Sequence, residues 1–144
     1  MQSTGVTVMS LRTSDGRRPR VALVGGTPAS AMVAGVLIEQ FGCSGLSARR
    51  SGEVLSLLAS REPIDLVVVD VNGGDDALTT SELIGTLGAG QPPVVALADM
   101  RAPPGRGLRF AHLASTVAKP YSPRELFGAM QSALRVQPAV VGTA

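Results

Sequence analysis

The apolar positions of the chain fall into short runs separated by polar turns, and several of these runs are rich in β-branched residues. The most marked run covers 66–69, directly after Asp65 and directly before Asp70. A short, uninterrupted run of this kind indicates a strand that is buried on both faces, as in a parallel sheet covered by helices. The pattern predicts a central strand over 64–70, with the carboxyl group of Asp70 at its carboxyl end.

Similar runs alternate with helical patterns along the rest of the chain. Further strands are predicted at 21–24, 46–49, 94–98 and 115–118, and helices at 29–41, 51–61, 79–87, 108–113 and 123–135. The first helix has the clearest signals, because Thr27 can cap it, Pro28 suits its first turn and Gly42 suits its end. Strands that alternate with helices predict a (βα)5 fold with a parallel sheet and right-handed crossovers.

The carboxyl ends of the first, third and fifth predicted strands meet at one edge of such a sheet. They contribute Gly25, Gly26, Asp70 and Lys119. Open α/β sheets bind their ligands at this edge, so these residues form the candidate site. A purely structural interpretation stays open, in which Asp70 ends its strand and accepts hydrogen bonds from loop amides. The dinucleotide fingerprint G-x-G-x-x-G is absent at the glycine pair.

Composition narrows the class of protein. The chain has 144 residues, of which 44% are hydrophobic and 3% aromatic, which suits one domain with a core of Val, Leu, Ala and Ile. No apolar run approaches the ~20 residues that span a bilayer, so no membrane association is expected. Cys43 is the single cysteine, which excludes an internal disulfide and favours a reducing cytoplasm.

Charge is concentrated at the start of the chain. Four arginines against one aspartate lie within the first twenty residues, and the rest is close to neutral. We therefore expect a flexible basic linker at 1–19, a domain at 20–135 and a flexible tail at 136–144. No basic stripe with interleaved aromatic residues supports DNA binding.

Two stretches resemble the receiver domain of two-component response regulators: Asp-Leu-Val-Val-Val-Asp at 65–70 and Ala-Lys-Pro-Tyr-Ser-Pro-Arg-Glu-Leu at 118–126. The resemblance implies a flavodoxin-like, doubly wound sheet with strand order 2-1-3-4-5, here with a short or disordered fourth helix. In that family an aspartate after the third strand accepts a phosphoryl group and a lysine after the fifth contacts it. Asp70 and Lys119 match those two positions, and the chemistry suits a carboxylate nucleophile and a cation.

Other positions depart from the family pattern. The acidic pair that holds Mg²⁺, the hydroxyl residue after the fourth strand, the aromatic switch residue and the Met-Pro pair are replaced by Gly25-Gly26, Ala98, Thr116 and Gly73-Gly74. Glycine offers no side-chain oxygen, and Mg²⁺ requires several oxygen ligands. The prediction is a degenerate receiver, or pseudo-receiver, with no metal, no cofactor and no enzyme activity. A metal site rebuilt from Asp75, Asp76 and Asp99 is a weaker alternative to solvated loop carboxylates, and Asp70 and Lys119 are expected to pair.

The preferred functional interpretation is a non-catalytic, cytoplasmic protein-interaction module. Its partner would be a histidine kinase or another signalling domain, in the same polypeptide or a separate one. The resemblance to receiver domains implies that this partner docks over 108–113, 115–118 and 123–135. One alternative is a working phosphoacceptor at Asp70 with unusual metal handling. Another is a sensor of an anionic nucleotide, such as a cyclic dinucleotide, because arginine forks and an aromatic ring suit such a ligand. The candidate surface for partner or ligand comprises Arg101, Arg106, Arg109, Tyr121 and Arg124; a solvated arginine face is the simpler alternative.

Overall fold

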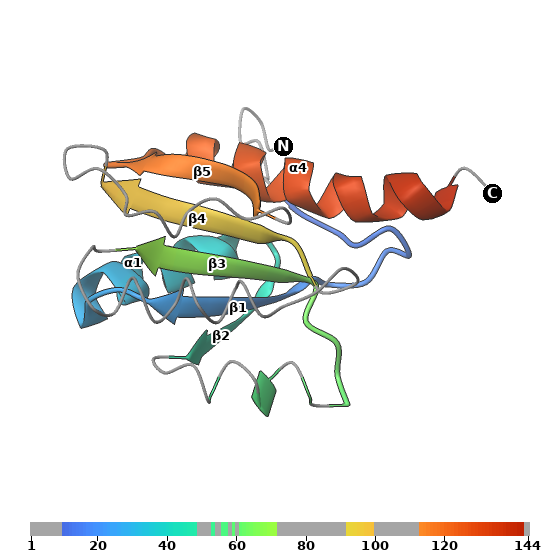
Figure 1. Cartoon of the computed structure of the whole chain (residues 1–144), viewed down its shortest axis with the longest axis horizontal. Helices are drawn as coiled ribbons and strands as arrows, with labels where there is room; N and C mark the ends of the chain where they lie inside the picture. Colours follow the sequence, from blue (N-terminus) through green and yellow to red (C-terminus); the bar gives the residue numbers. More distant parts are fainter. Residues whose placement is uncertain are drawn as a thin grey trace, which may run out of the picture.

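The structure is a computed structural model that describes residues 10–48, 53, 56, 57, 59, 61–71, 92–99 and 113–142. Its elements, in chain order, are β1 (Arg20–Gly25), α1 (Pro28–Gln40), β2 (Ser44–Ala48), β3 (Leu66–Val71), β4 (Val94–Asp99), β5 (Leu113–Lys119) and α4 (Pro123–Gly142). The strands form one parallel sheet in the order β2-β1-β3-β4-β5 (Figure 1). This order confirms the flavodoxin-like fold that the sequence predicts.

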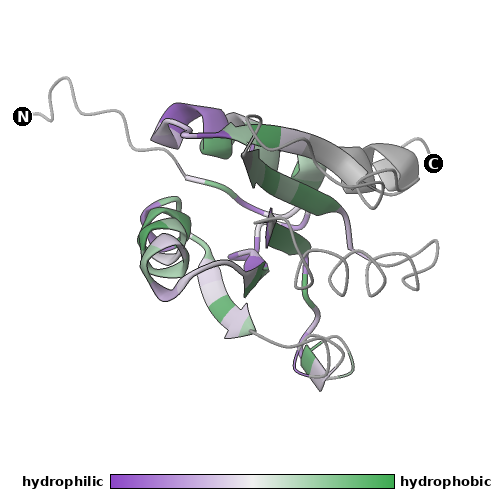
Figure 2. Cartoon of the chain, turned by 60° about the vertical axis from the view of Figure 1, so that its left-hand side comes forward, coloured by the Kyte–Doolittle hydropathy of each residue, from purple (hydrophilic) through white to green (hydrophobic). Residues whose placement is uncertain are grey.

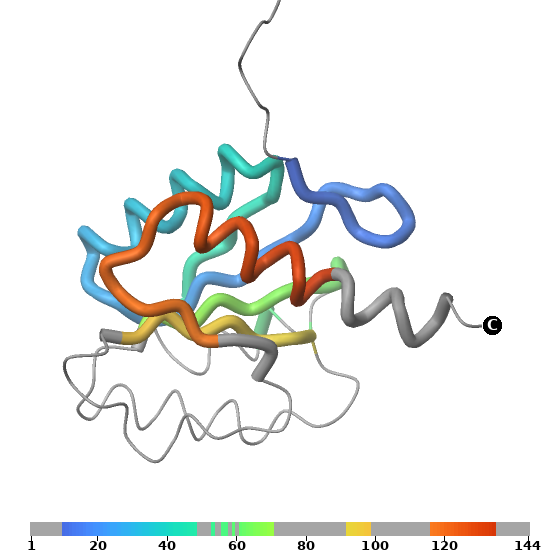
Figure 3. The backbone as a smooth tube through the Cα atoms, turned by 90° about the horizontal axis from the view of Figure 1, so that it is seen from above, coloured from blue at the N-terminus to red at the C-terminus, as the bar shows by residue number. Residues whose placement is uncertain are grey.

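The sheet separates two apolar layers because side chains alternate between its faces. On one face, Leu23, Val68 and Leu97 pack with residues of α1 and α4, and both helices lie on this side of the sheet (Figure 3). On the other face, Val24, Val69 and Ala96 form a second cluster. The residues Leu66–Val69 of β3 are all at most 1% exposed, so the prediction of a strand buried on both faces is confirmed. In Figure 2 the central strands are coloured mainly as hydrophobic.

Helix α1 begins and ends at the residues that its sequence signals indicate. Thr27 is the N-cap, and its Oγ1 accepts a hydrogen bond from the backbone N–H of Ser30 at 3.1 Å. Ser30 Oγ in return accepts from the Thr27 N–H at 3.0 Å, which completes a capping box. After the helix, Gly42 has φ of +85°, a conformation that glycine adopts without strain.

The packed unit begins earlier than residue 20, where the sequence analysis places the start of the domain. Leu11 is 3% exposed and its N–H donates to the carbonyl of Phe41 at 2.8 Å. Arg17 Nη2 contacts Asp65 Oδ1 at 3.0 Å, and the Arg20 N–H donates to Asp65 Oδ2 at 2.8 Å. Residues 11–20 are therefore attached to the sheet through one apolar side chain and one buried carboxylate.

The other boundaries also differ from the expected ones. Helix α4 continues to Gly142, past residue 136, where the sequence analysis places the start of a flexible tail. Leu113 is the first residue of β5 and so does not end a helix. The predicted helix at 79–87, and the rest of the short fourth helix, lie outside the described residues. No helix in the described part of the chain has the length and apolar character needed to cross a membrane.

Candidate functional site

The carboxyl ends of three strands bring the predicted residues together at one edge of the sheet. Gly25 of β1 is in register with Asp70 of β3, and Lys119 ends β5. Strand β4 lies between β3 and β5, so the Lys119 side chain crosses β4 to reach Asp70. We call Gly25, Gly26, Asp70 and Lys119 the rim.

The centre of the rim is an ion pair between Lys119 Nζ and Asp70 Oδ1. The Asp70 side chain is 2% exposed and that of Lys119 is 21% exposed. The pairing of these two residues that the sequence predicts is therefore present. A carboxylate removed from water in this way depends on the cation beside it, because an unpaired buried charge is strongly unfavourable.

The two glycines of the rim close it from the side of β1. Both have positive φ, +80° for Gly25 and +84° for Gly26. A Cβ added to Gly26 would lie 2.7 Å from Asp70 Oδ2 and 2.9 Å from Ser30 Oγ, and one added to Gly25 would lie 2.9 Å from the Asp70 carbonyl oxygen. The backbone of the glycine pair therefore packs directly on Asp70, in space that a side chain would need.

This packing is the part of the site that the sequence analysis missed. The sequence alone indicates that the glycine pair has no side chains that could bind a metal. It does not indicate whether the space that such side chains would occupy is empty. The structure places Asp70 and Ser30 against that space. Two adjacent glycines directly before a helix N-cap were a signal for backbone with positive φ.

Ala98 and Thr116, which the sequence analysis interprets as lost switch positions, both carry small side chains. Ala98 is 1% exposed, in register with Val71 of β3 and Ala118 of β5. Thr116 of β5 is exposed. The small methyl group of Ala98 has no hydroxyl to donate to a group on Asp70.

The candidate partner surface is described only in part. Tyr121 is half-buried, and the pKa of its phenol is raised, first by burial and then by the negative charge of Asp70. Arg124 is exposed and, with Thr116 of β5, lines a groove of about 530 Å³ between β5 and α4. Arg101, Arg106 and Arg109 lie outside the described residues, so the structure does not place them beside Arg124.

Potential metal ligands do not gather in the part of the chain that the structure describes. The described residues contain no group of three or more His, Cys, Asp or Glu side chains arranged to hold a metal ion. Asp75 and Asp76 lie outside those residues, and Asp99 is described only by its backbone in β4. Cys43 is fully buried, and burial raises the pKa of its thiol to about 11, which makes it a poor nucleophile near neutral pH.

Comparison with solved structures gives the fold a family context. The signal receiver domain of an HD domain-containing protein from Pseudomonas fluorescens superposes with a TM-score of 0.71 at 22% identity, over 85% of this chain and 99% of that one. A response regulator receiver domain protein from Clostridium thermocellum gives a TM-score of 0.67 at 16% identity, with coverages of 85% and 98%. This chain has the receiver-domain fold.

Another match covers only about half of a longer chain. The response regulator PhyR from Brucella abortus matches with a TM-score of 0.63 at 22% identity, over 90% of this chain but 51% of that one. No protein-family profile and no curated protein sequence matches the chain. In the receiver fold, the rim occupies the carboxyl edge of the sheet, where open α/β folds bind ligands.

Proposed function

We propose that the chain is a degenerate receiver domain that acts as a non-catalytic interaction module in two-component signalling. It would transmit a signal through protein contacts and not through Mg²⁺-dependent phosphorylation of Asp70. The observation that carries this proposal is the packing of Gly26 on Asp70 Oδ2, where a Cβ would lie 2.7 Å away. The receiver fold supports the signalling context, and the rim supports the loss of the phosphorylation chemistry.

Phosphoryl transfer to Asp70 would require an accessible carboxylate oxygen and a cation that stabilises the transferring group. Oδ1 is engaged by Lys119, and Oδ2 faces the backbone of Gly26. Mg²⁺ binds in near-octahedral geometry at about 2.0–2.1 Å from its oxygen ligands, and neither glycine of the rim supplies a side-chain oxygen. The rim is therefore arranged as a packed ion pair and not as an open metal site.

The partner would dock on the side of the molecule formed by β5 and α4. The groove there is open to solvent and combines the exposed Thr116 with the charged side chains of Arg124 and Glu125. A polar, partly charged groove of this kind suits another signalling domain, such as a histidine kinase. Charged side chains at the edge of the groove and the shape of the groove would both contribute to recognition. Arg101, Arg106 and Arg109, which follow β4 in the sequence, would extend this surface.

The experiment is an amide NMR titration of the pure chain with Mg²⁺ and then with the phosphodonor acetyl phosphate. We expect no saturable shift at Asp70 or its neighbours and no gain of a phosphoryl group by intact-mass spectrometry. Asp70→Asn is the matched control, because it removes the acceptor oxygen and keeps the size of the side chain. A saturable shift, or a mass gain that Asp70→Asn abolishes, would show that the domain is a phosphoacceptor.

A second experiment, in cells that express the chain, distinguishes the contribution of the rim from that of the β5–α4 groove. We expect Asp70→Asn to leave the transcript profile close to that of the unmodified strain. Arg124→Glu is expected to shift the profile towards that of a deletion strain, because it reverses a charge on the β5–α4 groove. The opposite result, with Asp70→Asn disruptive and Arg124→Glu silent, would contradict the proposal.

A further inference from the structure

Helix α1 is apolar on its outer side as well as on its inner side. Ala34 and Ile38 face the core and are fully buried, whereas Met32, Val33 and Val36 are 71%, 56% and 51% exposed. Together with the exposed Ala29 they occupy positions i, i+3, i+4 and i+7 of the helix, which form one continuous stripe. We call Ala29, Met32, Val33 and Val36 the outer stripe.

An outer stripe of this composition is unusual for a surface helix. Helices that are apolar all round are normally buried, and contiguous exposed apolar patches mark interaction sites. Between Pro28 and Ile38 the helix has no charged residue. The stripe therefore has the properties of a covered surface, although the described residues leave it exposed.

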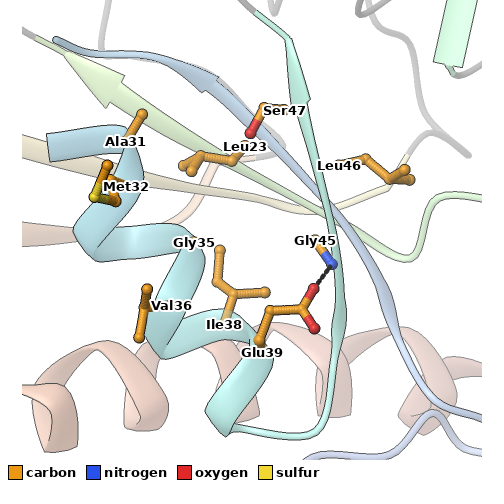
Figure 4. A pocket seen from close by; sticks show the side chains of 10 residues that line it. All are labelled: Leu23, Ala31, Met32, Gly35, Val36, Ile38, Glu39, Gly45, Leu46 and Ser47. Carbon is orange, nitrogen blue, oxygen red and sulfur yellow. Dashed lines mark hydrogen bonds between the residues drawn. The ribbon is translucent and has the colours of Figure 1, made fainter. Parts of the chain in front are cut away.

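A shallow groove runs beside the stripe. Its volume is about 310 Å³, and it is lined by Met32 and Val36 of α1 and by Gly45 and Ser47 of the edge strand β2 (Figure 4). Glu39 lies at the end of the groove, where its Oε2 accepts a hydrogen bond from the Gly45 N–H at 2.9 Å. A ridge of side chains beside a groove is the shape that a second helix complements.

The charges at the two ends of α1 fit an antiparallel copy of the same helix. The first turn contains no acidic residue and the last turn no basic residue, so neither helix end is neutralised by a charge within its own helix. Glu39, 55% exposed, is near the carboxyl end and contacts Arg18 at 3.4 Å. In its own helix this carboxylate is on the unfavourable side of the helix dipole.

Antiparallel pairing places this charge favourably. A two-fold axis between Met32 and Val33 pairs residues whose numbers add to 65, so that Met32 faces Val33 and Ala29 faces Val36. The same relation places Glu39 opposite Gly26, directly before the N-cap Thr27 of the other copy. There the carboxylate lies at the positive end of the partner helix, where acidic groups are stabilising.

We infer that the outer stripe of α1 binds the outer stripe of a second copy of this chain, with the two helices antiparallel. The pairing is isologous, so each copy gives the same residues to the contact. A stripe of about two turns buries less area than the ~1,200 Å² of a stable interface. The association is therefore weak, with a dissociation constant between about 1 µM and 1 mM.

Sedimentation velocity from about 10 µM to about 1 mM tests the association. The unmodified chain is expected to pass from monomer to dimer, and Val33→Glu is expected to stay monomeric because it buries two carboxylates at the axis. Ser132→Glu is the matched control, since it adds the same charge at an exposed position of α4. An unmodified chain that stays monomeric at about 1 mM, or equal association of the two variants, would overturn the inference.

Disulfide trapping tests the antiparallel geometry in a Cys43→Ala background, which removes the single native thiol. Ala29→Cys mixed with Val36→Cys is expected to cross-link faster than either variant alone. Ala29→Cys that cross-links mainly with itself would indicate parallel helices and contradict the register. One further outcome would exclude self-pairing: the chain stays monomeric, and a different protein binds the unmodified chain but not Val33→Glu. The outer stripe would then be the binding surface for that protein. None of these outcomes depends on phosphorylation at Asp70, so they are separate from the tests of the proposed function.

Discussion

At Gly26 a positive φ coincides with the shortest distance to an added Cβ among the described glycines. Its φ is +84°, and an added Cβ would lie 2.7 Å from Asp70 Oδ2. Gly26→Ala should lower the free energy of unfolding by about 2–5 kcal/mol, since a left-handed φ costs roughly 1–2 kcal/mol and overpacking about 1–3. Denaturant unfolding monitored by circular dichroism measures the change.

Gly16 provides the matched control for this prediction. It has the same φ of +84°, but nothing lies within 4 Å of an added Cβ. Gly16→Ala should therefore lower the free energy of unfolding by only about 1–2 kcal/mol, the backbone contribution. Shortening Asp70 in Gly26→Ala/Asp70→Ala should recover part of the packing loss. Equal losses in Gly16→Ala and Gly26→Ala would show that the contact with Asp70 has no energetic effect.

The ion pair of the rim gives a second prediction for single residues. Lys119→Met leaves the carboxylate of Asp70, 2% exposed, without its cation. Removing one partner of a buried pair typically lowers the free energy of unfolding by about 3–5 kcal/mol, and we expect about 3 because Lys119 lies near the surface. Asp70→Asn/Lys119→Met should be more stable than Lys119→Met alone, since no mispaired charge remains. Equal stability of the two variants in urea denaturation would argue against the pairing as a source of stability.

Among the elements of the fold, the segment before β1 gives the clearest test of where the domain begins. Leu11 is 3% exposed and belongs to the same core cluster as Ile38 and Phe41 of the α1 region. Leu11→Ala should therefore lower the free energy of unfolding by about 2–4 kcal/mol, as for other buried leucines. Met32→Ala, at a position that is 71% exposed, serves as the control when measured at low protein concentration. A neutral Leu11→Ala would support a linker that extends to residue 19.

The strands and the first helix could be predicted from the sequence because their signals are local. The branched apolar run of β3 and the Thr27, Pro28 and Gly42 signals of α1 each specify structure within a few residues. The attachment of the N-terminal segment could not be predicted in this way. It depends on a single leucine and on the contact of Arg17 with Asp65, 48 positions along the chain, and neither produces a periodic pattern.

The extension of α4 and the packing of the rim escaped sequence reasoning for different reasons. Helix α4 continues through Pro138 to Gly142, although a proline inside a helix normally favours an end before it. At the rim, the sequence predicted that glycine cannot hold Mg²⁺. The position of Asp70 Oδ2 relative to Gly26 follows from the register of β1 with β3, which is a property of the folded sheet.

At the scale of the whole molecule, α1 and α4 together form a layer that covers one face of the sheet. Phe41, directly after α1, and Phe127 of α4 meet edge to face, with ring centroids 5.2 Å apart and planes at 80°. Cys43 belongs to the same apolar cluster, and Tyr121 packs against it. Two weakly acidic groups are thus placed where the folded state favours their neutral forms.

This arrangement predicts how global stability depends on pH in the alkaline range. Burial raises the pKa of Cys43 from 9.0 to about 11, so between these values the folded chain keeps a proton that the unfolded chain has lost. Stability therefore falls as pH rises from 9 to about 11, by at most about 2.7 kcal/mol. The pKa of Tyr121 is also raised by burial. The stability of the folded chain therefore decreases further as pH rises past the ordinary pKa of a phenol.

Thermal or urea unfolding measured across this pH range would show the decrease, and variants assign it to the two groups. Cys43→Ala lacks the thiol, so its profile should be flatter than that of the unmodified chain between pH 9 and about 11, even though its stability at neutral pH is lower. Cys43→Ala/Tyr121→Phe should be flatter still, because the phenol is also gone. If Cys43→Ala keeps the slope of the unmodified chain, the thiol does not titrate with folding, and its burial in the core cluster does not control the alkaline limit of stability.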